Sequence, residues 1–227
     1  MDKDILKKYL VSLDLSPDDD RVRIISLLSA VIAVCQNDIT RVFYKYLKEI
    51  NFAGTAVYET ILQSYLFLGF PRMIEAALIH NEIFGGSFDN VDGNLRKISE
   101  QEAEEWFSKG VNLCRQVYGK NFERLKEKFI SVSPEMFRWM VIEGYGKVLT
   151  RPGLSSIERE LAEVAALIVD RRERQLTSHI IGSLNVGASI KQLRQVNEDI
   201  KPLAGAETFK ITGQLIDNII VKYRKNA

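Results

Sequence analysis

Apolar residues recur at the three- and four-residue spacing of an α-helix along almost the whole chain, and this periodicity constrains the fold most. The 227 residues include only five prolines and fourteen glycines, so few points interrupt the pattern. No stretch shows the sustained alternation and β-branched enrichment that indicate a strand. The sequence therefore predicts an all-α protein. Helices are expected at 4–13, 17–35, 39–50, 56–68, 71–79, 99–117, 120–130, 134–144, 155–169, 174–186, 189–200 and 206–224.

Composition and charge exclude several classes of protein. The chain is 46% hydrophobic and 27% charged with a net charge of +1, so no general attraction to nucleic acid or an anionic membrane is expected. Its apolar runs are too short for a membrane span, and its N-terminus lacks the apolar core of a secretory signal. Cys35 and Cys114 are too few and too distant for a disulfide framework or a zinc site, and we expect inert buried thiols. A cytoplasmic location follows as the expectation.

One break divides the chain into two parts. Residues 80–99 are rich in Gly, Asn, Asp and Ser and lack periodicity. We predict a helical unit at 1–80, a linker at 81–99 and a second unit at 100–227. A displacement of 136 residues also aligns the two parts, with helix lengths and breaks that agree, which predicts two degenerate repeats. The aligned pairs include Arg23 with Arg159, Asn51 with Gly187, and Gly69 with Gly205.

The candidate chemistry lies in residues 143–187. His179 is on an expected helix, and a histidine is the natural general acid or base near neutral pH. If the chain reverses near Arg171, Glu160 on the preceding helix comes close to level with His179 and could orient its imidazole. The alternatives are a structural histidine bonded between helices and a glutamate that is simply favourable at a helix N-terminus.

Two arginines are candidates for binding a substrate carboxylate. Arg151 precedes a proline, so its backbone is expected to be extended and its guanidinium free to enter a cleft. Arg159 could serve likewise. The alternatives are an ion pair between helices or subunits for Arg151, and a structural pair with Glu163 at i,i+4 for Arg159.

From about residue 106 to 216 the chain resembles the γ-carboxymuconolactone decarboxylase family, which belongs with the alkylhydroperoxidase D-like proteins. The resemblance rests on Val117-Tyr118-Gly119, Tyr145-Gly146-Lys147-Val148, Arg151-Pro152-Gly153-Leu154, Arg159, His179, Gly187 and Gly205. The first half resembles the later part of the same unit through Glu59, Gln63, Tyr65, Gly69, Pro71 and Arg72. The resemblance implies an alkylhydroperoxidase D-like helical bundle of two units, a cytoplasmic location and symmetric homo-oligomers.

The chain departs from the family's peroxidase branch. Arg172 and Gln175 stand where that branch has its Cys-x-x-Cys pair, four residues before His179 at its closer member. Glu160 matches the proton-relay glutamate of the peroxidase branch, which decarboxylase members often lack. In the first half the matching positions are filled by residues without such chemistry, so that copy is expected to be silent. These are Ile24, Gln36, Ile39 and Phe43.

Three functions remain as hypotheses. The first is a cofactor-free decarboxylase or related lyase without a metal, which acts on a small carboxylated lactone through His179 and Glu160, with Arg151 and Arg159 binding the substrate. The second is a thiol-dependent hydroperoxide reductase, which the missing cysteine pair disfavours. The third is a non-catalytic helical oligomer.

Overall fold

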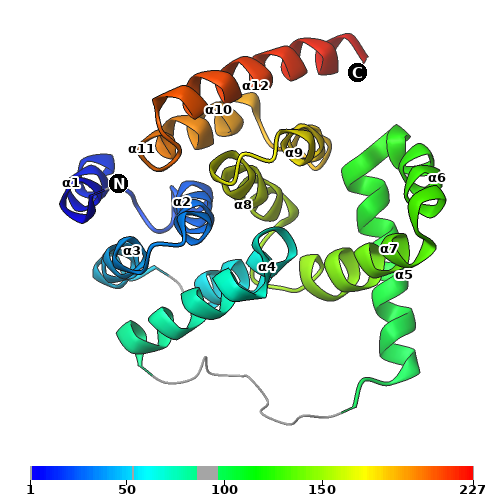
Figure 1. The fold of residues 1–227 in the computed structure, drawn as a ribbon, viewed down its shortest axis with the longest axis horizontal. Coiled ribbons are helices and arrows are strands. Elements are labelled where there is room, and N and C mark those ends of the chain that lie inside the picture. The colour runs from blue at the N-terminus through cyan, green and yellow to red at the C-terminus, as the bar shows by residue number, and fades with distance from the viewer. Residues whose placement is uncertain (1, 53, 86–96, 227) are drawn as a thin grey trace.

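The computed structural model describes residues 2–52, 54–85 and 97–226, and every regular element in these ranges is a helix (Figure 1). This confirms the all-α prediction. None of the described helices is long and apolar enough to cross a membrane. The elements are α1 Lys3–Leu13, α2 Arg21–Val34, α3 Asn37–Glu49, α4 Gly54–Phe84, α5 Glu100–Tyr118, η1 Gly119–Asn121, α6 Phe122–Val132, α7 Pro134–Trp139, η2 Met140–Leu149, α8 Ser156–Val169, α9 Glu173–Asn185, α10 Ile190–Asp199, α11 Lys201–Ala204 and α12 Ala206–Asn226.

The larger hydrophobic core is shared by the two halves of the chain. Helix α2 packs along α8 at its centre, and ten consecutive residues of α2, Ile24 to Ala33, are buried. A helix that is apolar all round belongs in an interior, which explains why α2 lies between α3, α4 and α8. Residues from 6 to 79 and from 154 to 220 pack in this one core. The two predicted units therefore bury their apolar faces against each other.

The backbone corners of the two halves agree at the displacement of 136 residues. Helices α3 and α9 have matching bounds, 37–49 and 173–185. Left-handed residues end α2 and α8 at matching positions, with φ of 55° at Cys35 and 57° at Arg171. Gly69 and Gly205 both have φ near 80° and extended ψ, 79°/162° and 86°/157°. The internal repeat stays a prediction, and these correspondences favour it.

Helices α5, α6 and α7 lie beside the rest of the molecule (Figure 1), and with η2 they enclose a second, smaller core. Helix α5 crosses the π-helix η2 at a very short distance. A Cβ at Gly110 would lie 2.1 Å from the Val141 carbonyl oxygen, and one at Gly146 would lie 1.9 Å from that of Trp106. Only glycine fits at such a backbone approach. The crossing fixes η2, which forms one wall of the candidate site.

Several boundaries differ from the sequence prediction. Helix α2 begins at Arg21 rather than 17, because residues 16–20 form a turn in which the Asp20 carboxylate accepts the Ser16 N–H at 3.0 Å. The helices predicted at 56–68 and 71–79 are joined as α4, with a kink at Gly69. Helix α4 also runs to Phe84, into the predicted linker 81–99, of which residues 86–96 lie outside the described residues.

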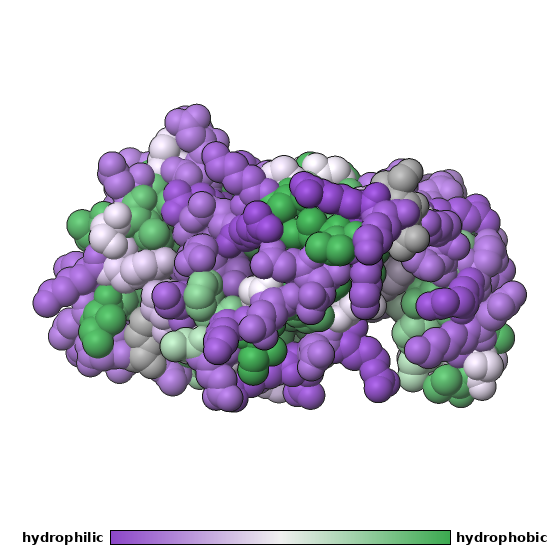
Figure 2. Space-filling view, turned by 90° about the horizontal axis from the view of Figure 1, so that it is seen from above, coloured by the Kyte–Doolittle hydropathy of each residue, from purple (hydrophilic) through white to green (hydrophobic). Residues whose placement is uncertain are grey.

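The outer surface is mainly hydrophilic on the face seen in Figure 2, with apolar side chains in small separate patches. Exposed large apolar residues occur on several helices, including Phe70 on α4, Trp139 on α7 and Ile211 on α12. Scattered apolar side chains of this kind are ordinary on a protein surface. The polar chemistry that needs explanation lies inside the molecule, between α8 and α9.

Candidate functional site

Helices α8 and α9 form an antiparallel hairpin that positions the candidate residues. Helix α8 begins with a capping box, in which Ser155 accepts the Glu158 N–H and the Glu158 carboxylate accepts the Ser155 N–H. The left-handed Arg171 lies in the turn that follows α8, and α9 returns along α8. The hairpin places Glu160 beside His179, as the sequence predicts.

His179 contacts two glutamates through the same ring nitrogen. Its Nδ1 lies 3.1 Å from Glu160 Oε2 and 2.8 Å from Glu163 Oε2. All three side chains are buried, with at most 7% of any of them exposed. Glu163 follows Glu160 by three residues, so both carboxylates project from one face of α8. The result is a buried cluster of one imidazole and two carboxylates.

Glu163 is a site residue that the sequence analysis missed. The sequence suggests Glu163 only as an alternative partner of Arg159, at i,i+4 on the same helix. The spacing of three residues from Glu160 was the signal that could have placed it beside His179. The sequence could not show which side of α8 would face α9.

This cluster retains protons at neutral pH. Burial raises the pKa of Glu163 to about 7 and Glu160 adds to the rise, although His179 opposes it. Burial alone would lower the pKa of His179, but the negative charges of Glu160 and Glu163 outweigh it and raise that pKa to about 10. One Nδ1–H serves two carboxylates, and neither oxygen of Glu163 receives a well-directed hydrogen bond. His179 is therefore an imidazolium held by carboxylates that are short of donors.

Neighbouring residues leave the cluster little freedom to move. A Cβ at Gly182 would lie 2.7 Å from Glu160 Oε2 and 2.8 Å from Val117 Cγ1, so α9 needs glycine there. The Phe67 ring meets the His179 ring edge to face, with centroids 5.1 Å apart. The imidazole is thus fixed by packing on one side and by charge on the other.

The His179 side chain lines a cavity of about 830 Å³. This volume lies within the usual range of small-molecule sites. Because Nδ1 faces the carboxylates, Nε2 is the ring nitrogen left for a bound molecule. The cavity is also lined by Tyr65, Phe67, Arg72, Tyr118, Phe129, Met136, Trp139, Met140, Glu143, Tyr145, Asp170, Arg172 and Gln175.

The cavity walls differ in polarity from side to side. On the η2 wall, the Tyr65 hydroxyl donates to Glu143 at 2.6 Å, and Lys147 donates to the same carboxylate at 2.9 Å. Tyr145 donates to the Tyr118 hydroxyl at 3.1 Å, and burial raises the pKa of both phenols. Both phenols are therefore neutral and can offer only hydrogen bonds.

Arg151 and Arg159 lie elsewhere, and neither lines this cavity. The Arg151 guanidinium binds Glu59 through Nε at 3.0 Å and Nη2 at 2.9 Å. Arg159 is 2% exposed and donates to the other Glu59 oxygen at 3.0 Å and to Gln63 at 3.0 Å. Glu59 on α4 of the first half supplies the carboxylate that both guanidinium groups contact, which is the ion pair between helices that the sequence offered as the alternative for Arg151. For Arg159, this contact takes the place of the alternative pair with Glu163.

The positions of the absent cysteine pair, Arg172 and Gln175, line the cavity together with His179. Cys114 is buried, and burial raises the pKa of its thiol. Cys35 is exposed, contrary to expectation, because it ends α2 in a left-handed conformation at the surface. Neither cysteine lines the cavity.

In the first half, the residues that match Glu160 and His179 are Ile24 and Phe43. Both are fully buried in the apolar core. The corresponding positions of the first half therefore pack with apolar side chains, without a polar cluster.

The three clustered residues also form the one group of potential metal donors among the described residues, with donor atoms within 4.8 Å of one another. His179 Nδ1 is hydrogen-bonded to Glu160 at 3.1 Å and forms an ion pair with Glu163 at 2.8 Å.

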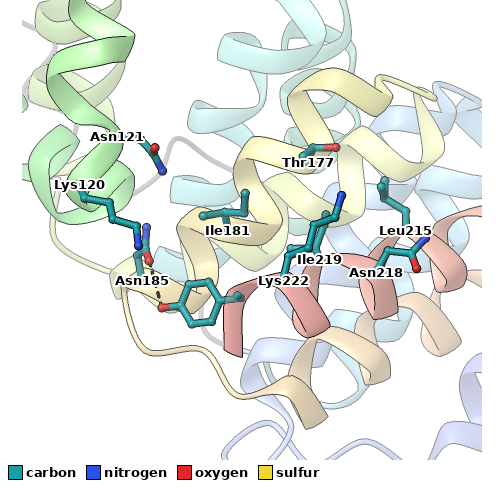
Figure 3. A pocket seen from close by; sticks show the side chains of 10 residues that line it. Lys120, Asn121, Thr177, Ile181, Asn185, Leu215, Asn218, Ile219 and Lys222 are labelled. Atoms are coloured by element: carbon teal, nitrogen blue, oxygen red, sulfur yellow. Dashed lines mark hydrogen bonds between the residues drawn. The ribbon is translucent and has the colours of Figure 1, made fainter. Parts of the chain in front are cut away.

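A second cavity of about 580 Å³ lies on another face of α9 (Figure 3). Thr177, Ile181 and Asn185 line it from α9, with Lys222 from α12 and Lys120 from η1. Asn185 accepts from the Tyr223 hydroxyl at 3.0 Å and donates to the Val117 carbonyl at 2.7 Å, which joins α5, α9 and α12. No residue of the buried cluster reaches this cavity.

A comparison with known families finds one match to this part of the chain. Residues 134–210 match the carboxymuconolactone decarboxylase family. The matched segment begins at Pro134 of α7 and includes the α8–α9 hairpin with Glu160, Glu163 and His179. No curated protein matches the chain. The segment that carries the cluster of His179 and two glutamates is therefore similar to the carboxymuconolactone decarboxylase family.

Proposed function

We propose that this protein is a cofactor-free acid–base enzyme of the decarboxylase type that acts on a small carboxylated lactone. The observation that carries the proposal is the position of His179, which lines the cavity while two buried carboxylates hold its Nδ1. The family match supports the reaction class and leaves the substrate open.

His179 would supply the proton that completes the reaction. As the bond between the ring carbon and its carboxylate breaks, the electron pair passes into the conjugated lactone and carbon dioxide leaves. The imidazolium then gives its Nε2 proton to that carbon, and solvent restores the proton. Glu160 and Glu163 stabilise the charged imidazolium and fix its orientation, as a carboxylate bound to the non-reacting ring nitrogen does for catalytic histidines.

The two alternatives have less support. A thiol-dependent reductase needs an accessible cysteine of low pKa, and neither Cys35 nor Cys114 lines the cavity. A purely structural cluster would cost free energy, because burying three ionisable groups is expensive and their counterparts Ile24 and Phe43 are apolar.

The test is the turnover of γ-carboxymuconolactone and related carboxylated lactones, followed by release of carbon dioxide. We expect His179→Gln to lower the rate by about 100-fold or more, the usual contribution of a positioned acid. Arg174→Gln, on the exposed face of the same helix, is the control and should leave the rate unchanged. Equal rates for His179→Gln and the intact protein would refute the proposal.

A further inference from the structure

We infer that Arg72 and Arg172 bind a carboxylate of the ligand at the end of the His179 cavity. This inference rests on the proposed function of the same cavity, and it assigns the anion-binding role that Arg151 and Arg159 do not fill. The chemical class of the ligand is an organic anion with an apolar body.

The two arginines converge on one acid, Asp170, in the turn between α8 and α9. Arg72 Nη1 donates to Asp170 Oδ1 at 2.7 Å, and Arg172 Nε donates to Oδ2 at 2.7 Å. All three residues line the cavity. The side chain of Asp170 is 12% exposed, whereas those of Arg72 and Arg172 are 30% and 65% exposed. The carboxylate is thus fixed at the base, and the guanidinium groups extend beyond it.

This arrangement carries an excess of positive charge and of donors. Two guanidinium groups against one carboxylate leave a net charge of +1. A guanidinium has five N–H donors, and the bonds to Asp170 use one from each arginine. A second carboxylate would complete the pairing in the fork geometry that guanidinium groups favour.

Position along α9 connects this anion site to the cluster. Arg172 is the N-cap residue of α9, Gln175 and His179 follow it by three and seven residues, and all three line the cavity. Arg172 and His179 are roughly 10 Å apart along the helix axis, from the rise per residue. The ligand carboxylate that the arginines bind therefore holds the ligand in place. The ligand carbon that receives the proton from His179 is a different part of the molecule.

The opposite wall fixes the orientation of such a ligand. Glu143 lies on η2 and already accepts bonds from Tyr65 and Lys147. Lys147 pairs with this carboxylate at 2.9 Å, so the Glu143–Lys147 pair has no excess positive charge to attract a carboxylate to that wall. Phe67, Tyr118 and Trp139 also line the cavity and offer apolar surface for the body of the ligand. An anionic group is thus directed to the arginines.

The test is binding measured by calorimetry with matched pairs of acids and amides. Benzoate, phenylacetate and 4-phenylbutanoate are each compared with the corresponding amide. We expect at least one acid to bind more tightly than its amide. Arg72→Gln and Arg172→Gln should each weaken that acid about tenfold or more and leave the amide unchanged, whereas Arg174→Gln should change the acid by less than twofold.

His179→Gln separates this inference from the proposed reaction, since it should still bind the acid within threefold of the intact protein. Thermal unfolding of each variant confirms that it is folded. The inference is wrong if no acid binds more tightly than its amide, if either cavity arginine can be replaced without loss, or if Arg174→Gln causes the same loss. None of these results depends on whether the protein turns over a lactone.

Discussion

His179 differs from an ordinary buried histidine because two carboxylates contact the same ring nitrogen. A neutral imidazole would leave Glu160 and Glu163 as two buried negative charges at close range. The imidazolium lowers that cost, so the folded state retains a proton that the unfolded chain releases. The same arrangement supplies a proton donor beside a cavity and makes stability depend on pH.

The first prediction concerns this dependence. The pKa of His179 is raised from its ordinary 6.5 to about 10, so its contribution to stability is complete below pH 6.5 and is lost as pH rises through 10. Between pH 7 and 9 we expect the free energy of unfolding to fall by about 2 kcal/mol on this account. Urea unfolding at both pH values should show that the double variant His179→Gln/Glu163→Gln, which also removes the carboxyl whose pKa burial raises to about 7, lacks most of the fall. A fall of the same size in the variant would contradict the assignment.

The second prediction concerns Gly182. Adding a methyl group forces Glu160 or Val117 to move, because the new Cβ would lie 2.7 and 2.8 Å from their atoms. Gly182→Ala should cost about 1–3 kcal/mol of stability as an overpacking change. The control is Gly213→Ala in α12, whose nearest neighbour would be Asn197 Nδ2 at 3.5 Å. It should be neutral or stabilising, as Ala is in a helix. Equal effects in thermal unfolding would show that Gly182 is not tightly enclosed.

For single residues, the sequence predicts contacts between side chains that lie close together along the chain. Glu160 and His179 belong to one hairpin with a short turn, so their approach follows from helix spacing. Arg151 and Arg159 both form ion pairs with Glu59, about a hundred residues earlier in the chain. No local sequence pattern indicates that contact. The same limit hides the pairing of Arg72 with Asp170.

The elements differ in how well the sequence predicts them. The helix starts expected at 99 and 155 are correct, because capping boxes at Ser99 and Ser155 begin α5 and α8. The π-helix η2 follows α7 directly and extends to Leu149, beyond the helix end expected near residues 144–146. The wider turns of this π-helix lie where η2 crosses α5. That crossing is a tertiary contact, which the apolar periodicity of the sequence does not indicate.

The third prediction tests that crossing. Gly146→Ala places a Cβ 1.9 Å from the Trp106 carbonyl oxygen, so the backbones of α5 and η2 must separate. We expect a loss of about 3 kcal/mol or more. Gly144→Ala is the matched control, since the nearest atom to its Cβ would be a Leu66 methyl carbon at 4.0 Å. Circular dichroism melts that agree for the two variants would contradict the close approach.

The whole molecule depends on the contact between α2 and α8. The larger core draws buried residues from both halves, including Leu28 on α2 and Val164 on α8, each 0% exposed. The all-α fold and the family could be predicted because helical periodicity and spaced motifs survive in the sequence. The shared core could not be predicted from the sequence, because the same apolar helix faces could equally form the cores of two separate domains.

The fourth prediction follows from the shared core. Fragments 1–85 and 97–227, produced separately, should fail to fold, because each would expose the apolar face that the other covers. Coexpressed, they should form a soluble 1:1 complex with helical circular dichroism. Analytical centrifugation and thermal melts decide the outcome. A cooperative melt from either fragment alone would show that the halves are independent domains.

The α2–α8 contact also determines how association within this chain responds to dilution. Two separate units that met through these helices would part at low concentration, as any dimer does. Here the chain carries both, so their pairing is intramolecular and independent of protein concentration. The same face is closed to a second molecule, since Leu28 and Val164 are already buried. Any larger assembly of this protein must therefore form through its outer helices, and its breakdown on dilution would leave the α8–α9 hairpin and the His179 cluster intact.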